Sequence, residues 1–331
     1  MNERRFLLYT CFGSPIMVQP TPEIDAFIGR IQTLSPGPSV SLDAALQPSL
    51  DEEAELRTLF ATDRQNARLS NPYVGLVDVF AAPDAIRVTR ARVVQGKEDL
   101  SSQYVMPLSN ENRRQEGAPC LVADLEEFKK NWAIFTEGSL LQLLDWNNVI
   151  AAGGSVLASL SPLDEEHKKS KRAIRKYYHS NVYPTSDVDL FLWGLNAEQV
   201  RTSVALVRHL QRLTMSFSQA EAKIKQIFEA VRDSVPWDVT CIRSRHTISI
   251  HCELIDGSIH TCLRPLLAQY PYRSVQIVLR LYHSPAEVLA GFDIDAPCCA
   301  YDGSSFLIKS RSSLILTQEL ECGPIHGPSL L

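Results

Sequence analysis

The sequence predicts an α/β (α+β) protein in which helices flank a mixed sheet. Apolar residues recur at helical spacing through residues 196–233. They alternate with polar residues over 237–254, and residues 275–282 are mostly apolar, which is typical of strands. Helices that alternate with strands pack on the faces of a sheet. The chain has 331 residues, of which 45% are hydrophobic, and can therefore bury a sizeable core.

Residues 1–124 are expected to form an N-terminal extension of mixed, partly irregular structure. Thr21 provides helix-start chemistry before a stripe of apolar residues, and Pro and Ser punctuate the chain after it. The predicted elements are a helix over 21–31, a linker over 34–49, an exposed helix over 51–66 and strands within 73–94. A structural flank is the simpler interpretation of this extension, and a docking surface for a protein partner is the alternative.

Residues 125–303 are expected to form the core domain, and residues 304–331 an irregular C-terminal tail. Within the core, an apolar approach over 149–152 leads into a glycine-rich turn. The other predicted elements are helices over 139–144, 156–160 and 284–290 and strands over 186–194, 237–254 and 275–282. The tail is rich in Ser and Gly-Pro punctuation and shows no amphipathic helix.

Two carboxylates one residue apart, Asp187 and Asp189, lie within the otherwise apolar run 186–194. In a strand, residues i and i+2 point to the same face, so both carboxylates project together while Val188 and Leu190 pack behind them. Like charges this close repel each other unless a cation or a basic partner lies between them. A solvated surface pair is the alternative, but the apolar flanks favour a site for a hard divalent cation.

The apolar segment before this strand ends in Gly153, Gly154 and Ser155. A hydrophobic segment that ends in Gly-Gly-Ser, followed by a helix and a Ser-Asp-x-Asp strand, resembles the nucleotidyltransferase superfamily with the polymerase-beta-like fold. The resemblance covers about residues 125–303 and implies that the glycine turn and Ser155 hold the phosphates of a nucleoside triphosphate (NTP). It also implies that Asp187 and Asp189 hold Mg (or Mn). Glycine suits this role because it lets the backbone approach a phosphate closely.

Segments 131–140, 144–149 and 280–289 more loosely resemble an uncharacterised fungal branch of this superfamily, in which some proteins carry ankyrin repeats. That branch supplies no established substrate. The superfamily also implies a third carboxylate on a neighbouring strand. The pattern Phe-Asp-hydrophobic makes Asp293 the first choice, as a further catalytic and metal-binding residue, and Asp295 the alternative. The alternative interpretation of this pair is an ordinary aspartate at the start of a strand, which caps the preceding helix region.

The chain departs from the superfamily pattern in two places. Between Ser155 and Asp187 there are 31 intervening residues, a longer spacing than the resemblance implies. This insertion includes the charged segment 164–179, which predicts a short exposed helix. Its bases could gather a triphosphate or a nucleic-acid backbone, although a solvated surface is the simpler interpretation. In addition, 28 residues follow Gly303 and show no amphipathic helix, whereas many relatives in the superfamily carry a further helical domain that closes over the nucleotide.

Composition narrows the class of protein further. A net charge of −5 argues against general nucleic-acid coating, and no apolar run approaches the roughly 18 residues of a membrane span. The eight cysteines are scattered or adjacent, which predicts a reduced intracellular protein, in cytoplasm or nucleus, rather than a disulfide framework. The histidines show no zinc-hydrolase spacing, and the glycine turn lacks the Gly-Lys-Ser/Thr of a P-loop.

The resemblance and the residues together predict a metal-dependent nucleotidyltransferase. It would transfer a nucleotidyl group from an NTP to a hydroxyl of an unknown acceptor, which could be RNA, a protein or a small molecule. Arg280, or a base within 168–176, is the candidate to neutralise the triphosphate. The alternative is a catalytically silent domain of the same fold that serves as an interaction module. The intact carboxylate pair favours the enzyme, and the short tail favours the module.

Overall fold

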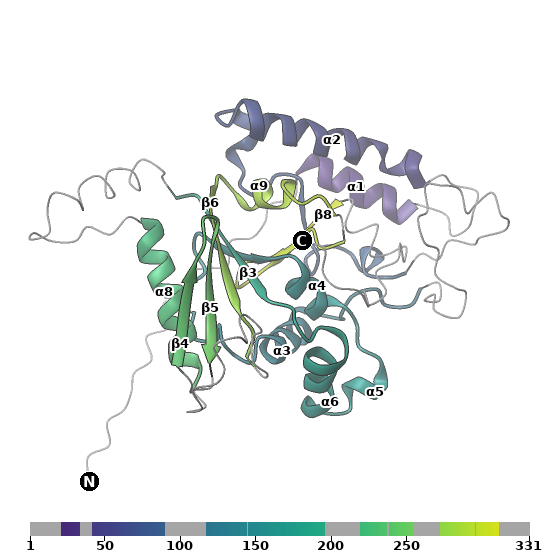
Figure 1. Ribbon diagram of the computed structural model, residues 1–331. Helices are drawn as coiled ribbons and strands as arrows, with labels where there is room; N and C mark the ends of the chain where they lie inside the picture. The colour runs from purple at the N-terminus through teal and green to yellow at the C-terminus, as the bar shows by residue number, and fades with distance from the viewer. Residues whose placement is uncertain are drawn as a thin grey trace, which may run out of the picture.

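The computed structural model (Figure 1) describes residues 21–33, 42–89, 117–143, 145–195, 219–236, 238–253, 272–294 and 296–310. Its centre is an eight-stranded sheet with the strand order β1-β8-β7-β2-β3-β6-β5-β4. The strands are β1 Leu76–Asp78, β2 Val149–Ala152, β3 Val188–Trp193, β4 Asp238–Arg243, β5 Thr247–Glu253, β6 Val275–Tyr282, β7 Cys299–Tyr301 and β8 Phe306–Lys309. Strands β3 and β6 pair in parallel, and the other neighbours pair antiparallel.

Helices cover both faces of this sheet, so the predicted α/β class with a mixed sheet is confirmed. The α-helices are α1 Pro22–Thr33, α2 Leu42–Thr62, α3 Leu125–Phe135, α4 Gly154–Leu160, α5 Glu165–Lys168, α6 Lys171–Lys176, α8 Gln219–Ser234 and α9 Pro285–Ala290. A π-helical turn, η5 Tyr177–Val182, follows α6. Short 3-10 turns occur at Ala67–Ser70 and Asp84–Ile86.

Successive residues of the central strands alternate between two apolar clusters, as a pleated strand requires. Val149 and Ala151 of β2 belong to the larger cluster, which includes residues of α1, α3, α4 and α8. Ile150 and Ala152 belong to the smaller one, which includes Leu56 of α2 and residues of α9. Figure 1 shows α2 and α9 on one side of the sheet and α3, α4, α5 and α6 on the other. Apolar residues on both faces explain why these strands read as almost continuous apolar runs.

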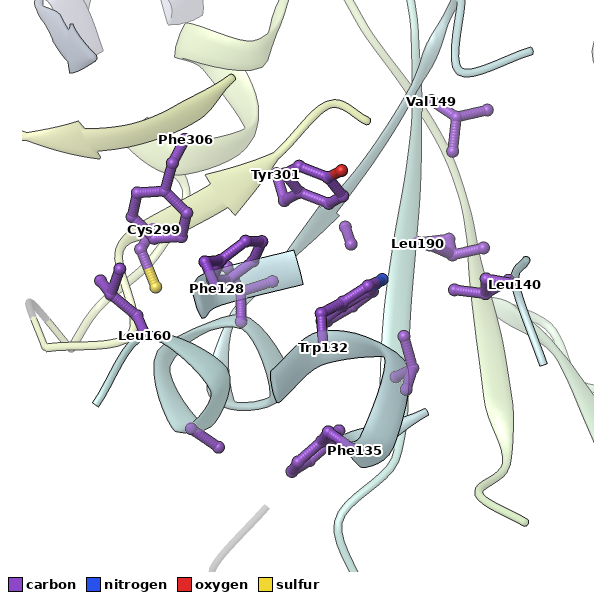
Figure 2. Packing of buried hydrophobic residues seen from close by; sticks show 14 of the residues in the cluster. Phe128, Trp132, Phe135, Leu140, Val149, Leu160, Leu190, Cys299, Tyr301 and Phe306 are labelled. Carbon is purple, nitrogen blue, oxygen red and sulfur yellow. The ribbon is translucent and has the colours of Figure 1, made fainter. Parts of the chain in front are cut away.

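Aromatic side chains of α3 fix that helix against the sheet (Figure 2). The ring of Phe128 lies 5.0 Å from the ring of Tyr301 and 5.1 Å from that of Phe306, both edge-on, and Trp132 is 5.9 Å from Tyr301. Asp124 caps the helix by accepting a hydrogen bond of 2.8 Å from the Glu127 N–H. Helix α3 is therefore packed against β7 and β8 by aromatic contacts, and β7 is the neighbour of β2, whose end forms the glycine turn.

The expected division of the chain differs from the structure at both ends of the core. Strand β1, from the N-terminal extension, pairs with β8, which lies within the predicted irregular tail 304–331. The sheet therefore continues past residue 303, because Phe306, Leu307 and Ile308 are fully buried and complete both apolar clusters. Residues 311–331 lie outside the described part of the chain.

Several predicted elements also change in extent or type. Helix α2 begins at Leu42, inside the predicted linker 34–49, and contains Pro48, because Leu56 and Phe60 pack it on the sheet and tertiary packing outweighs propensity. The strand-rich region 73–94 contains only β1 among its described residues. Residues 139–143 form turns rather than a helix, because Gly138 adopts a left-handed φ of 75° at the end of α3.

The remaining predictions for strands and helices hold where the structure describes them. Helices α1, α4 and α9 and strands β4, β5 and β6 lie where the apolar patterns predict them. The predicted helical stretch 196–233 is described only from residue 219, as α8, and residues 196–218 lie outside the described part. Cys298 and Cys299 are buried at the start of β7, as expected of small core residues.

Candidate nucleotide and metal site

The two aspartates lie where strand β3 begins. Val188 and Leu190 are fully buried on the larger cluster, so Asp187 and Asp189 face the other side of the sheet, where each is partly exposed. Phe191, two residues further along the same face, packs under α9 in the smaller cluster. The carboxylates thus occupy the open end of a strand that is otherwise covered, as the alternation predicts.

Both carboxyl groups are held in an environment that disfavours charge. Burial, followed by the like charge of Asp187, raises the pKa of Asp189 to about 7. Burial also raises the pKa of Asp187, although its own backbone N–H, the charge of Arg273 and the amide of Gln276 oppose the rise. No hydrogen bond to the Asp189 carboxylate occurs among the described residues. The two carboxylates therefore repel each other when ionised, and a bound cation would relieve that repulsion.

The glycine turn lies directly beside Asp189. Gly153 has a φ of 94°, a conformation that side chains rarely adopt, and its N–H donates to the Cys299 carbonyl oxygen at 3.1 Å. A Cβ at Gly153 would lie 3.5 Å from the Phe292 ring and 4.0 Å from Asp189 Oδ2. Gly154 is exposed, with nothing within 4 Å of the position of a Cβ. The turn thus leaves a small space between the backbone, the aromatic ring and the carboxylate.

Ser155 follows this turn as the second residue of α4. The residue is 2% exposed, and its Oγ is buried without a hydrogen-bond partner among the described residues. A buried hydroxyl without a partner costs free energy, and native proteins retain few of them. A buried hydroxyl without a partner, two residues after the Gly153 turn that adjoins Asp189, is what a site for an oxygen-rich ligand would leave in its ligand-free form.

Arg273, immediately before β6, holds the chain that leads into Asp187. It is 2% exposed, and its guanidinium donates to the carbonyl oxygens of Phe135 (2.9 Å), Tyr178 (3.0 Å), Tyr183 (2.7 Å) and Ser186 (2.7 Å). It also stacks 3.8 Å from the centre of the Phe135 ring. Burial lowers the pKa of Arg273 to about 10, so the group stays charged at neutral pH. Arg273 thereby fixes the end of the long insertion at the site.

The insertion itself is folded against the core rather than extended as one exposed helix. It forms α5, α6 and η5, and Tyr178 is fully buried. Two of its bases form ion pairs with acids of the core, Lys168 with Glu127 at 3.1 Å and Arg175 with Glu137, and His179 Nε2 lies 3.1 Å from Glu137 Oε1. These contacts favour a structural role for Lys168 and Arg175, whereas Lys169, Lys171, Arg172 and Lys176 are exposed. Arg280, the other candidate phosphate-binding base, is largely exposed and lies 3.5 Å from Glu287.

The structure does not bring the third predicted carboxylate into a group with the first two. Asp293 lies in an exposed bend between α9 and β7 rather than on a strand. Its neighbour Phe292 reaches the site, with its ring 5.9 Å from that of Phe191. Asp295 lies outside the described residues. Among the described residues, no three His, Cys, Asp or Glu side chains form a metal-binding group.

Two site residues were not predicted from the sequence. Gln276 of β6 pairs with Asp189 across the parallel ladder, and its amide donates a hydrogen bond to Asp187 Oδ2. His251 of β5 lies near enough to lower the pKa of Asp187, and its Nε2 is buried without a partner among the described residues. The only signal for Gln276 in the sequence is a single amide within the apolar run 275–282.

The described side chains fit a magnesium or manganese ion. Mg²⁺ is commonly bound by one or two carboxylates together with water and substrate phosphates. Asp187 and Asp189 supply the carboxylates, the Gln276 side chain carries a carbonyl oxygen beside them, and the Ser155 hydroxyl has no partner within the described chain. A site with two carboxylates therefore suits a cation that arrives with a phosphate ligand.

Comparison with known proteins gives a family but no solved relative. One relative is an uncharacterised protein of Acanthamoeba polyphaga mimivirus, 30% identical over 104 residues, which cover 28% of this chain and 11% of that protein. The chain thus spans only a small part of the length of that relative. No solved structure matches. Among the described helices, none has both the length and the apolar character needed to cross a bilayer. Residues 125–314, more than half of the chain, match the Gabija anti-defense 2 family protein, and the chain therefore belongs to that family.

Proposed function

We propose that this protein is a metal-dependent nucleotidyltransferase that transfers a nucleotidyl group from an NTP to an acceptor hydroxyl. One observation carries the proposal: a partly buried pair of carboxylates, with the pKa of Asp189 raised to about 7, lies against the glycine turn at Gly153. A pair so destabilised by burial and repulsion is more typical of a functional site than of a structural ion pair. The motif resemblance supplies the reaction class.

Each element of the site has a distinct task in this proposal. Asp187 and Asp189 bind the cation, and the turn at Gly153 and Gly154 lets the backbone approach the β- and γ-phosphates. Ser155 donates its hydroxyl to a phosphate oxygen, which gives that buried group the partner it lacks. When bound, Mg²⁺ or Mn²⁺ neutralises triphosphate charge and orients the phosphates. Arg273 holds the chain before β3 in place, and thereby helps to position the two carboxylates.

The reaction itself needs few chemical groups from the protein. The acceptor oxygen forms a bond to the α-phosphorus, the bond from that phosphorus to the bridging oxygen breaks, and pyrophosphate leaves with the electron pair. The acceptor proton passes to water or to a side chain at the site. Positioning and charge neutralisation therefore account for most of the required catalysis.

The family description indicates where such an activity would be used. It names the family by anti-defense against Gabija. We extend this role to the present chain and propose that the transferred nucleotide, or the depletion of its donor, opposes Gabija. A Gabija component and a free nucleotide acceptor are then the first acceptors to test, before RNA or other proteins.

A second candidate function is an interaction module of the same fold that binds without transfer. The position of Gln276 favours it, because the strand beside the aspartates carries an amide where the superfamily resemblance implies a carboxylate. The two functions differ in one measurable property, the appearance of labelled product.

The experiment compares the wild type with Asp189→Asn and, as a matched control, with Asp63→Asn at an exposed position. Each protein is incubated with one of the four α-labelled NTPs, Mn²⁺ or Mg²⁺, and a cell extract with and without purified Gabija components. The proposal expects labelling by the wild type and by Asp63→Asn, with a loss of at least a hundredfold in Asp189→Asn. Folded wild type that labels nothing with any nucleotide would favour the silent module, and equal labelling by Asp189→Asn would refute the metal-ligand role.

A further inference from the structure

We infer that the site holds one divalent cation and not two, because the residue of β6 that faces the two aspartates is Gln276, which supplies an amide and not a third carboxylate. The inference rests on the proposed metal-dependent function. It concerns the charge and the ligand number of the site, which the described side chains define.

The topology of the sheet limits which strands can contribute a ligand. Strand β3 has two neighbours, β2 and β6. On β2, the residues that follow Ala151 opposite the start of β3 are Ala152 and Gly153, which provide no side-chain oxygen. On β6, Gln276 lies directly opposite Asp189, so its side chain is on the same face as both carboxylates. The amide is therefore the side-chain ligand that β2 and β6 offer to the pair. His251 of β5, one strand further, brings an imidazole near Asp187 and not a carboxylate.

The hydrogen bond of Gln276 fixes which of its atoms is available. Its Nε2 donates to Asp187 Oδ2, which leaves the amide carbonyl oxygen on the other branch of the side chain. A glutamine carbonyl is a neutral ligand for a hard cation. The hydrogen bond also occupies one oxygen of Asp187, which reduces the lone pairs available to bridge two cations.

The charge that the protein brings to the site matches one cation. Asp187 and Asp189 together contribute two negative charges when ionised, and one divalent cation neutralises them. Two-metal sites place their cations about 3.5–4 Å apart and need bridging anionic ligands to offset the repulsion. The Arg273 guanidinium, which donates to the Ser186 carbonyl oxygen one residue before Asp187, places a positive charge on that side and further disfavours a second cation.

Asp293 does not alter this count in the described structure. It lies in the exposed bend after α9, and it does not form a metal-binding group of three with Asp187 and Asp189 among the described residues. The exposed position leaves its carboxylate in water. A role for Asp293 as the third ligand would therefore require this bend to move when a cation binds, and the experiment below includes that outcome.

The test counts bound Mn²⁺ by titration calorimetry and by the loss of the free-ion signal in electron paramagnetic resonance. Mn²⁺ is added alone and with an NTP analogue whose α,β-bridging oxygen is replaced so that it resists transfer. The variants are Gln276→Glu, which adds a carboxylate of the same shape, Gln276→Met as a neutral control of similar volume, and Asp293→Asn. Thermal unfolding and circular dichroism confirm that each variant is folded.

The inference expects one Mn²⁺ for the wild type, Gln276→Met and Asp293→Asn, and a second, nucleotide-dependent Mn²⁺ for Gln276→Glu. Two Mn²⁺ in the wild type with the analogue bound would overturn the inference and leave the proposed function intact, and a fall from two to one in Asp293→Asn would identify that residue as the third ligand. A single Mn²⁺ in folded Gln276→Glu would also overturn it. Wild type that binds no Mn²⁺ with any analogue would overturn the proposed function as well.

Discussion

The Gln276 amide and the Asp187 carboxylate join the two parallel strands of the sheet at the point where the candidate site lies. Strands β3 and β6 form the only parallel pair among the described strands, and their starts lie side by side. Polar groups at the starts of adjacent parallel strands meet at one edge of the sheet, and Gln276 therefore lies beside the two aspartates. Because this residue is a glutamine, it adds no negative charge to the two carboxylates.

Replacing Asp189 by Asn is expected to raise the stability of the metal-free protein and to abolish tight metal binding. The change removes a buried charge whose pKa is raised by burial and by Asp187, so the apo fold loses a repulsive interaction. A gain of about 1 kcal/mol corresponds to a rise in Tm of about 2–4 °C for a domain of this size. Thermal unfolding in excess chelator and Mn²⁺ titration measure both effects. A fall in the Tm of metal-free Asp189→Asn would contradict the inference that Asp187 and Asp189 repel each other in the metal-free fold.

The same carboxyl predicts how stability depends on pH. Its folded pKa, about 7, lies above its ordinary value of 3.8, so the folded state binds the proton more tightly than the unfolded chain. The free energy of unfolding of the metal-free protein should therefore fall as the pH rises from about 4 to about 7, and this contribution should stay level above pH 7. Mn²⁺ affinity should rise over the upper part of the same range, because the cation requires the ionised form.

Urea unfolding at pH 5 and pH 8, in excess chelator, tests this dependence. The difference in unfolding free energy between the wild type and Asp189→Asn should be small at pH 5 and larger at pH 8, since the variant lacks the titrating group. A difference that is equal at both pH values would show that Asp189 titrates normally.

Arg273→Met is expected to destabilise the fold and to loosen the chain that precedes Asp187. The guanidinium satisfies four backbone carbonyl oxygens, and each buried carbonyl left without a partner costs about 1–3 kcal/mol. A loss of roughly 3 kcal/mol or more is therefore expected, with faster hydrogen exchange in residues 177–187 and weaker Mn²⁺ binding. Arg280→Met is the matched control, because that side chain is 59% exposed and its ion pair contributes about 0–1 kcal/mol. Similar losses in both variants would contradict the role given to Arg273.

The sequence was sufficient to predict the parts of the site that local pattern determines. Asp187, Asp189 and the turn at Gly153 lie together because strand alternation and a glycine between strand and helix are local features. Gln276 lies 89 residues from Asp187, and its place depends on the register of β6 against β3, which no local pattern states. The choice of Asp293 rested on motif likeness alone, and its segment follows α9 as a bend, so it does not extend a strand beside β3.

For the fold too, local patterns were predictable from the sequence and contacts between distant segments were not. The apolar patterns predicted the mixed sheet and most of its helices, but the partner of each strand depends on contacts between distant segments. Strand β1 pairs with β8, whose residues follow it by more than two hundred positions, and the short apolar run of β8 resembled a tail. The insertion is exposed along much of its length, as its charges predicted, but the pairing of Lys168 with Glu127 and of Arg175 with Glu137 depends on contacts that no local pattern states.

Alanine substitutions at the two adjacent glycines should have opposite effects. Gly153 has a φ of 94°, so Gly153→Ala strains the backbone and should cost about 1–3 kcal/mol. Gly154 has no such φ and open space around it, so Gly154→Ala should leave stability unchanged or raise it by up to about 1 kcal/mol within α4. If a triphosphate lies on the turn, the Gly154→Ala methyl group should still weaken NTP binding tenfold or more. Unchanged NTP binding in a folded Gly154→Ala variant would place the phosphates elsewhere.

The hydroxyl of Ser155 gives the most direct separation of binding from folding. Ser155→Ala removes a buried Oγ that has no partner among the described residues, so the apo protein should keep its stability or gain up to about 1 kcal/mol. A hydrogen bond to a charged phosphate oxygen contributes about 1.5–3 kcal/mol, which corresponds to a loss of roughly 10-fold or more in NTP affinity. Ser159→Ala is the control one turn later in α4, because its buried Oγ already has a partner, the Ser155 carbonyl oxygen, to which it donates at 3.0 Å. That variant should leave NTP affinity unchanged and lose up to about 1 kcal/mol of stability.

Fluorescence titration with a labelled NTP and urea unfolding of both variants decide whether the Ser155 hydroxyl binds phosphate or supports the fold. A loss of stability in Ser155→Ala with unchanged NTP affinity would mean that the hydroxyl supports the fold and does not bind phosphate.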